Sequence, residues 1–352
     1  MTDLPSDRPA TRLAHSGRAD KSCYGPVNPP VVRASTLLFA NTAELKAAAG
    51  TRRTYGRHGS ETTMALEQAL CALEGAADCL LTPSGLSAIS TTLLALLQPG
   101  DHLLMSDACY EPTRALCDGL LARLGIHTSY YDPLIGAGIS ELLQANTRVV
   151  FVEAAGSLTF EIHDVPALAA AAHAQGALLV ADSTWATPLG WDAFALGVDV
   201  SLHAATKYIV GHSDVLLGAI LCTAAVQPRL RQTYAALGLS VGGDDAYLAL
   251  RGLRTLAARL AVHRENTAQV LAWLAQRIVT RSVSRLGKRY SLLPPEVLND
   301  PILYPAADLL SALEFGAAAT LTDPNRACGR APVCGEDYMG RISGPLMDRF
   351  DL

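Results

Sequence analysis

The sequence predicts an α/β fold in which a mainly parallel sheet is covered by helices on both faces. Two patterns carry this prediction. Short apolar runs alternate with longer helix-like stretches from about residue 79 to residue 224, as in a doubly wound domain. The apolar runs are also continuous, without polar residues at alternate positions, which suits strands buried on both faces.

In chain order, strands are expected at residues 79–82, 102–105, 148–152, 177–181, 198–202 and 218–223. Helices are expected between them, at residues 86–97, 111–124 and 165–175. From residue 243 to about 277, charged side chains interleave with Leu and Ala, which predicts one long helix. We therefore divide the chain into an N-terminal arm (1–54), a large α/β domain (55–242), a linking helix (243–277) and an atypical tail (278–352).

Composition narrows the function classes. The 352 residues carry 28 Lys and Arg against 33 Asp and Glu, a net charge of −5, with 50% hydrophobic and 17% charged residues. A sizeable core is possible, and wholesale disorder is excluded. The mildly acidic balance argues against a nucleic-acid or anionic-membrane partner. Residues 79–100 are uncharged, but Pro83, Ser84 and Gly85 interrupt them, so a strand, a turn and a buried helix are expected there in place of a membrane span.

The cysteines and the start of the chain point to a compartment. No secretory segment is evident after Met1, and no CxxC pair occurs. We therefore expect reduced thiols in a cytoplasmic protein. The eight cysteines are Cys23, Cys71, Cys79, Cys109, Cys117, Cys222, Cys328 and Cys334.

Three features lie just beyond the carboxyl ends of predicted strands, where open α/β sheets bind ligands. Gly85 and Leu86 begin a helix whose N–H groups and dipole favour a phosphate, although an ordinary turn glycine explains Gly85 alone. Asp182 ends an apolar run, where a carboxylate is often only a helix cap. Lys207 follows an uncharged stretch, which is unusual for a lysine unless it reacts, pairs or simply reaches solvent.

Together these features suggest a site for pyridoxal phosphate (PLP). That cofactor needs a lysine for its Schiff base, an acidic partner for its ring nitrogen and a cradle for its phosphate. Lys207, Asp182 and the helix start at Gly85 supply the three in this order. Tyr110, beyond the strand at 102–105, is placed to stack on the ring. No metal site is expected.

Six sequence blocks, in order, resemble the Cys/Met-metabolism family of PLP enzymes over about residues 11–277. They are Tyr55-Gly56-Arg57-His58-Gly59, residues 82–88 (TPSGLSA), residues 156–161 (GSLTFE), residues 181–188 (ADSTWATP), residues 204–214 (AATKYIVGHSD) and residues 251–256 (RGLRTL). The resemblance implies the type I fold of PLP enzymes, a large α/β domain followed by a small C-terminal domain.

The resemblance also assigns roles by position. Lys207 matches the Schiff-base lysine, Asp182 the partner of the ring nitrogen and Tyr110 the stacked tyrosine. Gly85 and Leu86 match backbone donors to the phosphate, and Thr206 matches a hydroxyl donor. Tyr55 and Arg57 match residues that reach the phosphate of a neighbouring subunit, which implies a dimer within a tetramer.

Within the family, three details favour carbon–sulfur β-lyases acting on cystathionine over γ-lyases and γ-synthases. Gly59-Ser60-Glu61-Thr62 replaces the Asn-Pro-Thr usual in the γ-acting members, Ala204 replaces a serine, and Trp185 replaces a phenylalanine. Drift at non-catalytic positions is the alternative explanation. The resemblance implies that Lys207 takes the Cα proton, that Lys207 or Tyr110 protonates the leaving sulfur, and that homocysteine, pyruvate and ammonia are released.

The tail departs from the family. Its small domain, with an arginine that clamps the substrate carboxylate in an Arg-x-x-x-Gly-Leu-Glu context, has no match after Arg277, so we expect it to be truncated or replaced. The last fifteen residues, including Arg341 and Arg349, resemble magnesium-chelatase-like AAA+ ATPases, yet the sequence contains no GxxxxGK[ST] motif. A break in the lyase reading frame near Arg277 explains this better than a divergent domain. An active lyase, an inactive PLP-binding remnant and an unstable chimera all stay open.

Overall fold

The computed structural model describes residues 9–17, 27–48 and 54–269. Within them, seven strands form one sheet in the order β1-β7-β6-β5-β4-β2-β3. The strands are β1 (Asp78–Thr82), β2 (His102–Ser106), β3 (His127–Tyr131), β4 (Thr147–Glu153), β5 (Leu178–Asp182), β6 (Val200–His203) and β7 (Gly218–Cys222). Strands β3, β2, β4, β5 and β6 are parallel, whereas β7 runs antiparallel to both β6 and β1. The prediction of a mainly parallel sheet is confirmed.

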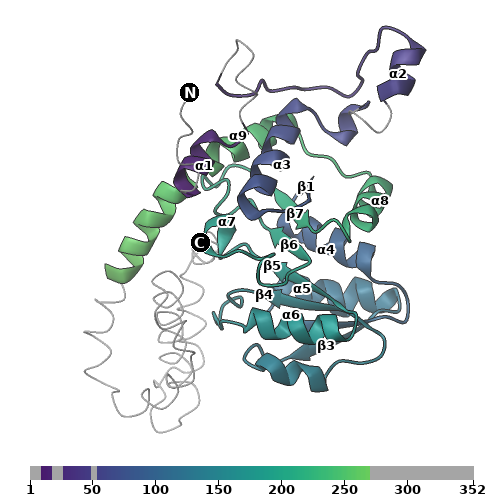
Figure 1. The fold of residues 1–352 in the computed structure, drawn as a ribbon, viewed down its shortest axis with the longest axis vertical. Helices are drawn as coiled ribbons and strands as arrows, with labels where there is room; N and C mark the ends of the chain where they lie inside the picture. The colour runs from purple at the N-terminus through teal and green to yellow at the C-terminus, as the bar shows by residue number, and fades with distance from the viewer. Residues whose placement is uncertain (1–8, 18–26, 49–53, 270–352) are drawn as a thin grey trace, which may run out of the picture.

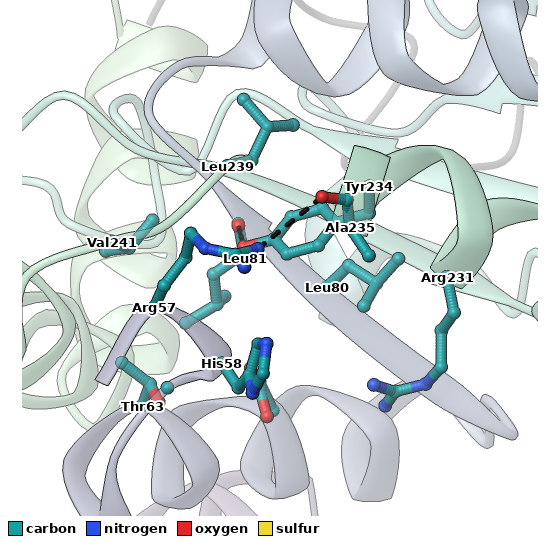
Figure 2. Close-up of a pocket in the computed structure, with 12 residues that line it drawn as sticks. Arg57, His58, Thr63, Leu80, Leu81, Arg231, Tyr234, Ala235, Leu239 and Val241 are labelled. Atoms are coloured by element: carbon teal, nitrogen blue, oxygen red, sulfur yellow. Dashed lines mark hydrogen bonds between the residues drawn. The ribbon is translucent and has the colours of Figure 1, made fainter. Parts of the chain in front are cut away.

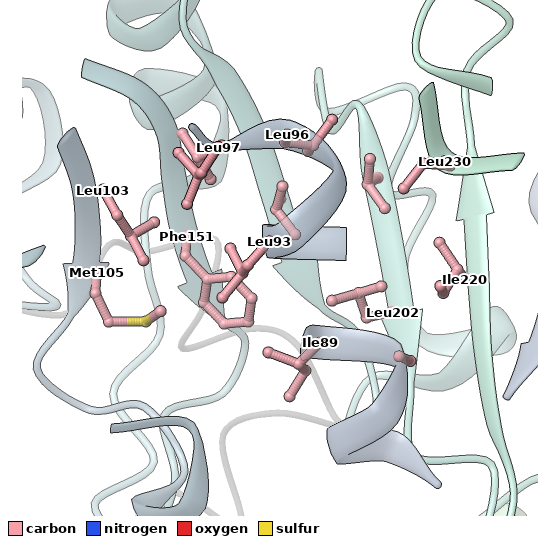
Figure 3. Close-up of a cluster of buried hydrophobic side chains, with 14 of the residues drawn as sticks. Ile89, Leu93, Leu96, Leu97, Leu103, Met105, Phe151, Leu202, Ile220 and Leu230 are labelled. Carbon is pink, nitrogen blue, oxygen red and sulfur yellow. The ribbon is translucent and has the colours of Figure 1, made fainter. Parts of the chain in front are cut away.

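Helices cover both faces of the sheet (Figure 1). One apolar cluster lies between the sheet and the face covered by α4 (Gly85–Leu96), α5 (Glu111–Leu116) and α8 (Gln227–Leu237), and Figure 3 shows Ile89 and Leu93 of α4 over Phe151 and Leu202. Two clusters fill the opposite face, under α3 (Glu61–Glu74) and α9 (Gly243–Leu253) and under α6 (Val165–Ala174). The sheet is therefore buried on both faces, as its continuous apolar strands predict.

Local capping signals fix the helices that border the site. Ser60 caps α3 in a reciprocal pair with Thr63, and Gly75 ends it in the left-handed conformation. Ser84 caps α4, with its Oγ accepting from the Ser87 N–H at 3.1 Å. The short helices are α1 (Pro9–His15), α2 (Thr42–Ala48) and α7 (Thr187–Gly190). A π-helical turn (Cys117–Leu121) continues α5, and 3₁₀ turns lie at Gly56–His58 and Gly136–Glu141.

Three features differ from the sequence expectations. Strand β3 was not expected, because its residues HTSYY are largely polar and lie at the sheet edge. The expected long helix is broken: α9 ends at Leu253, residues 254–255 form a turn, and a second helical stretch covers residues 256–269. Finally, α1 of the N-terminal arm buries Leu13 completely beside α3. The tail at 278–352 lies outside the described residues.

Candidate active site

The carboxyl ends of β4, β5 and β6 place the predicted residues at one edge of the sheet. Glu153 ends β4 and is the register partner of Asp182, which ends β5. Asp182 is in turn the register partner of Leu202 in β6, and the segment with Lys207 follows that strand directly. Because parallel strands end at the same edge, residues far apart in sequence meet there.

Asp182 is a buried carboxylate. Its side chain accepts a hydrogen bond from the Thr184 N–H at 2.9 Å, and the residue is only 7% exposed. Burial raises the pKa of Asp182, because the charged form loses its water, while the hydrogen bonds from Thr184 and the nearby His203 act in the opposite direction. The charged form of Asp182 therefore depends on the groups around it.

The start of α4 abuts the segment that leads to Lys207. A Cβ on Gly85 would lie 2.5 Å from the Cβ of Ala204, so no larger residue fits without displacement. The Gly85 and Leu86 N–H groups precede the first hydrogen bonds of this helix, which run from Ser87 and Ala88 back to Ser84. Such N–H groups at a helix start bind anions.

Backbone contacts fix the segment before Lys207. The Ala204 N–H donates to Thr184 Oγ1 at 2.7 Å, which ties this segment to the turn after Asp182. The Thr206 hydroxyl donates to the Leu217 carbonyl at 3.2 Å and accepts from the Leu217 N–H at 2.9 Å. Lys207 itself is half-buried. Donation from Thr206 to a phosphate stays a prediction, because this hydroxyl is bonded to Leu217 here.

Tyr110 lies at the same edge, in the loop after β2. Its N–H donates to Glu153 Oε2 at 2.7 Å, and its side chain is exposed. The neighbouring Ala108 carbonyl accepts from the Ser157 N–H at 2.7 Å, so the loops after β2 and β4 hold each other. The tyrosine side chain is thus exposed at the carboxyl edge of the sheet, and its stacking on a ring stays a prediction.

Tyr55 and Arg57 lie elsewhere. Tyr55 forms an isolated bridge with Thr36, and Arg57 Nη1 donates to the Ala235 carbonyl at 3.5 Å. Arg57 lines a pocket with His58 and Tyr234 (Figure 2). Tyr55 and Arg57 also line a second pocket, beside the start of α9. Neither pocket is lined by Gly85, Asp182 or Lys207. The structure therefore brings Gly85, Leu86, Asp182, Thr206, Lys207 and Tyr110 to one edge, whereas Tyr55 and Arg57 line pockets that include none of Gly85, Asp182 and Lys207.

The edge fits PLP. The helix start at Gly85 packs directly against Ala204, before Lys207, and offers N–H donors for a phosphate. Asp182 is a buried acid suited to a ring nitrogen, and Lys207 follows the strand beside it. In the part of the chain that the structure describes, no group of His, Cys, Asp or Glu could hold a metal ion, and no helix is long and apolar enough to cross a membrane.

Sequence reasoning missed several supporting residues. Glu153 holds the Tyr110 backbone, Thr184 joins Asp182 to Ala204, and a buried contact joins His203 to Glu74. A signal for two of them was available. Glu153 and His203 each end the strand that the apolar runs at 148–152 and 198–202 predict, in the position that Asp182 holds after its own run.

Comparison with known proteins finds relatives over about three quarters of the chain. The chain is 46% identical over 267 residues to a putative cystathionine beta-lyase of Rhizobium johnstonii, covering 76% of this chain and 67% of that protein. It is 44% identical over 272 residues to the cystathionine beta-lyase MetC of Escherichia coli, covering 76% of this chain and 69% of the relative. The crystal structure of metB from Corynebacterium glutamicum superposes with a TM-score of 0.73 at 30% identity, over 79% of this chain and 71% of that one.

Two families match successive parts of the chain. Residues 298–352 match the magnesium chelatase subunit ChlI family, in agreement with the resemblance of the last fifteen residues. Residues 10–291 match the family described as Cys/Met metabolism PLP-dependent enzymes, so this match continues past Arg277, where we expected it to stop. Because this match spans 282 of the 352 residues, the chain belongs to the Cys/Met-metabolism family of PLP-dependent enzymes.

Proposed function

We propose that this chain is a PLP-dependent carbon–sulfur β-lyase that cleaves L-cystathionine into homocysteine, pyruvate and ammonia. The observation that carries the proposal is the packing of Gly85 against Ala204, which joins an anion-binding helix start to the segment with Lys207. The relatives from Rhizobium johnstonii, Escherichia coli and Salmonella typhimurium, at 46%, 44% and 42% identity, bear the name cystathionine beta-lyase and support this choice of reaction.

The residues divide the chemistry among them. When bound, PLP supplies an electron-accepting ring that stabilises negative charge at the substrate Cα. Asp182 pairs with the ring nitrogen, and the Gly85 and Leu86 N–H groups hold the phosphate, with the Thr206 hydroxyl as a further donor. Tyr110 stacks on the ring, and its backbone is fixed by Glu153.

Lys207 acts as the general base in this proposal and is one of two candidate proton donors. As a free amine it removes the substrate Cα proton, because a lysine held beside the reacting carbon acts as a general base. Lys207 or Tyr110 then delivers a proton to the departing sulfur. Both residues follow strands that end at this edge; Lys207 is half-buried and the Tyr110 side chain is exposed.

The proposal includes an assembly and a compartment. Tyr55 and Arg57 contact the phosphate of a neighbouring subunit in a dimer of dimers. In their own subunit they line pockets that do not include Gly85, Asp182 or Lys207. The substrate is a small amino-acid thioether. The protein works in the cytoplasm, where the free thiols of Cys71, Cys79, Cys109, Cys117 and Cys222 stay reduced.

Two other functions have specific support. A γ-acting enzyme is supported by the solved cystathionine gamma synthase of Xanthomonas oryzae in complex with cystathionine, which matches with a TM-score of 0.71 at 34% identity, over 78% of this chain and 69% of that one. An inactive PLP-binding remnant is supported by two observations. Residues 298–352 match the magnesium chelatase family, and the arginine motif with which Cys/Met-metabolism enzymes bind the substrate carboxylate is absent from the sequence.

The test combines a label with a product assay on the full-length protein. Borohydride reduction followed by peptide mapping is expected to place the cofactor on Lys207, and cystathionine is expected to release pyruvate. Lys207→Ala should abolish the label and lower pyruvate release by roughly 10²–10⁴-fold or more, whereas Lys46→Ala, on exposed α2, should change neither. A label without pyruvate would favour the remnant, or a γ-acting enzyme if 2-oxobutyrate appears. An unlabelled protein would refute all three.

A further inference from the structure

A buried acid–base pair lies next to the site and has no part in the reaction just described. His203 Nε2 contacts Glu74 Oε1, although the two residues are 129 positions apart. Both side chains are only 2% exposed. Glu74 is the last residue of α3, and His203 is the last residue of β6, one position beyond the register partner of Asp182.

The surroundings of this pair favour a charged histidine. Burial alone disfavours the charge, but the attraction and hydrogen bond of Glu74 outweigh it and raise the pKa of His203. A carboxylate at the C-terminal end of a helix is opposed by the helix dipole, whereas a cation there is favoured. The second oxygen of Glu74 has no hydrogen-bond partner among the described residues, so His203 is the group that compensates its charge.

The side chain of His203 lies on the opposite face of the sheet from that of Asp182. Asp182 shares a sheet face with its partner Leu202 and with Val180, which belong to the cluster under α4. His203 pairs with Ala219, which faces α3 and α9 on the other side. The charge of His203 reaches across the sheet and opposes the effect of burial on Asp182. The hydroxyls of Ser183 and Ser201 beside it are neutral and bond to each other at 2.7 Å.

We propose that Glu74 and His203 are positioning residues for the cofactor, holding a positive charge behind Asp182 so that its carboxylate stays ionised and keeps a proton on the ring nitrogen. The inference rests on the proposed function, because it needs Asp182 to face the ring. Glu74 keeps His203 protonated, and His203 in turn stabilises the anion that pairs with the ring. Neither residue touches the cofactor or the substrate.

The experiment measures cofactor affinity. Full-length protein freed of cofactor is titrated with PLP and with the analogue in which a C–H replaces the ring nitrogen, and the ratio of the two dissociation constants is recorded. The analogue has no proton to share with Asp182. His203→Gln and Glu74→Gln should weaken PLP binding by about tenfold, the factor that matches one unit in the pKa of Asp182, and leave binding of the analogue unchanged. Glu74→Asp, which keeps the carboxylate, should keep most of the ratio.

Two controls separate this role from a structural one. In an Asp182→Asn background, His203→Gln should have no further effect on the ratio, because the group on which it acts is gone. His173→Gln, at an exposed His–Asp contact, should leave the ratio unchanged. An equal loss of affinity for PLP and analogue, or an unchanged ratio in both single variants, would overturn the inference. If the unmodified protein binds neither molecule, the proposed function fails and this inference fails with it.

Discussion

The two ends of the parallel strands use charged residues differently. At the amino ends, Asp101 and Asp199 meet Arg148 and His173 in pairs whose basic side chains are about half exposed. At the carboxyl ends, Asp182 and the pair of Glu74 and His203 are buried. Exposed pairs add little to stability, while buried charges cost free energy unless their partners compensate. Stability alone does not favour the buried charges at the carboxyl ends, and the proposed function gives them a role in binding the cofactor.

The largest effect is expected where the carboxyl end is most tightly packed. In Gly85→Ala the new Cβ would lie 2.5 Å from the Ala204 Cβ and push α4 away from the segment with Lys207. We expect a loss of about 1–3 kcal/mol in the free energy of unfolding, together with at least tenfold weaker PLP binding, measured by urea titration and cofactor titration. Gly119→Ala, which meets no atom within 4 Å, is the control. An unchanged affinity in Gly85→Ala would contradict the proposed phosphate cradle.

Acid should destabilise the carboxyl end through His163. Burial lowers the pKa of this histidine from 6.5 to about 4, and its Nε2 lies 2.8 Å from Ser106 Oγ at the end of β2. Between these two pH values the unfolded chain binds the proton more readily, so stability falls as the pH drops. We expect His163 to contribute a loss of about 2 kcal/mol in unfolding free energy between pH 7 and pH 5.

The check compares the loss between pH 7 and pH 5 in His163→Gln with that in the unmodified protein. The variant should be less sensitive to acid, whereas His127→Gln, at an exposed position in β3, should keep the original sensitivity. Equal acid sensitivity in His163→Gln and the unmodified protein would refute the role of His163 in this loss of stability.

His203 provides the opposite case. Its raised pKa means that its contribution to stability is present in acid and is lost as the pH rises through its folded value.

A smaller effect is expected from removing Glu153, which accepts a hydrogen bond from the Tyr110 backbone. Glu153→Ala removes the acceptor that lies 2.7 Å from the Tyr110 N–H. A hydrogen bond to a charged group is worth about 1.5–3 kcal/mol, so we expect kcat/KM for pyruvate release to fall about tenfold or more. Glu153→Gln keeps an acceptor oxygen and should lose less, and Glu141→Ala, on an exposed 3₁₀ turn, should lose nothing. Full activity in Glu153→Ala would show that the tyrosine needs no such support.

The smallest effect on stability is expected at the amino ends of the parallel strands. His173→Ala removes the contact of 2.8 Å between His173 Nε2 and Asp199, whose carboxylate also accepts the Leu179 N–H at 2.8 Å. Because the histidine side chain is 44% exposed, we expect a change below about 1 kcal/mol in unfolding free energy and no change in cofactor affinity. A loss as large as that of Gly85→Ala would remove the distinction between the two ends.

Much of the fold was predictable because burial leaves a continuous apolar run in the sequence. Six expected strands appear with their bounds shifted by at most two residues, and the prediction of helices around residues 86–97 and 165–175 is confirmed. Strand β3 escaped because an edge strand needs fewer apolar residues. The break at residues 254–255 was not predicted, because its surroundings include long-range contacts: Gly252 lies against the Val210 carbonyl, and Arg259 donates to the Ile209 carbonyl at 3.4 Å.

The sequence by itself determined the apolar strands, the helix caps at Ser60 and Ser84, and the order of motifs that identifies the family, because each depends on residues that are neighbours in the chain. Only the tertiary structure decided which side chains meet at the carboxyl edge. The contact of Glu74 with His203, the closeness of Gly85 to Ala204 and the register of Glu153 with Asp182 join residues that are 29 to 129 positions apart. Such contacts follow from strand order and packing, which no local pattern encodes.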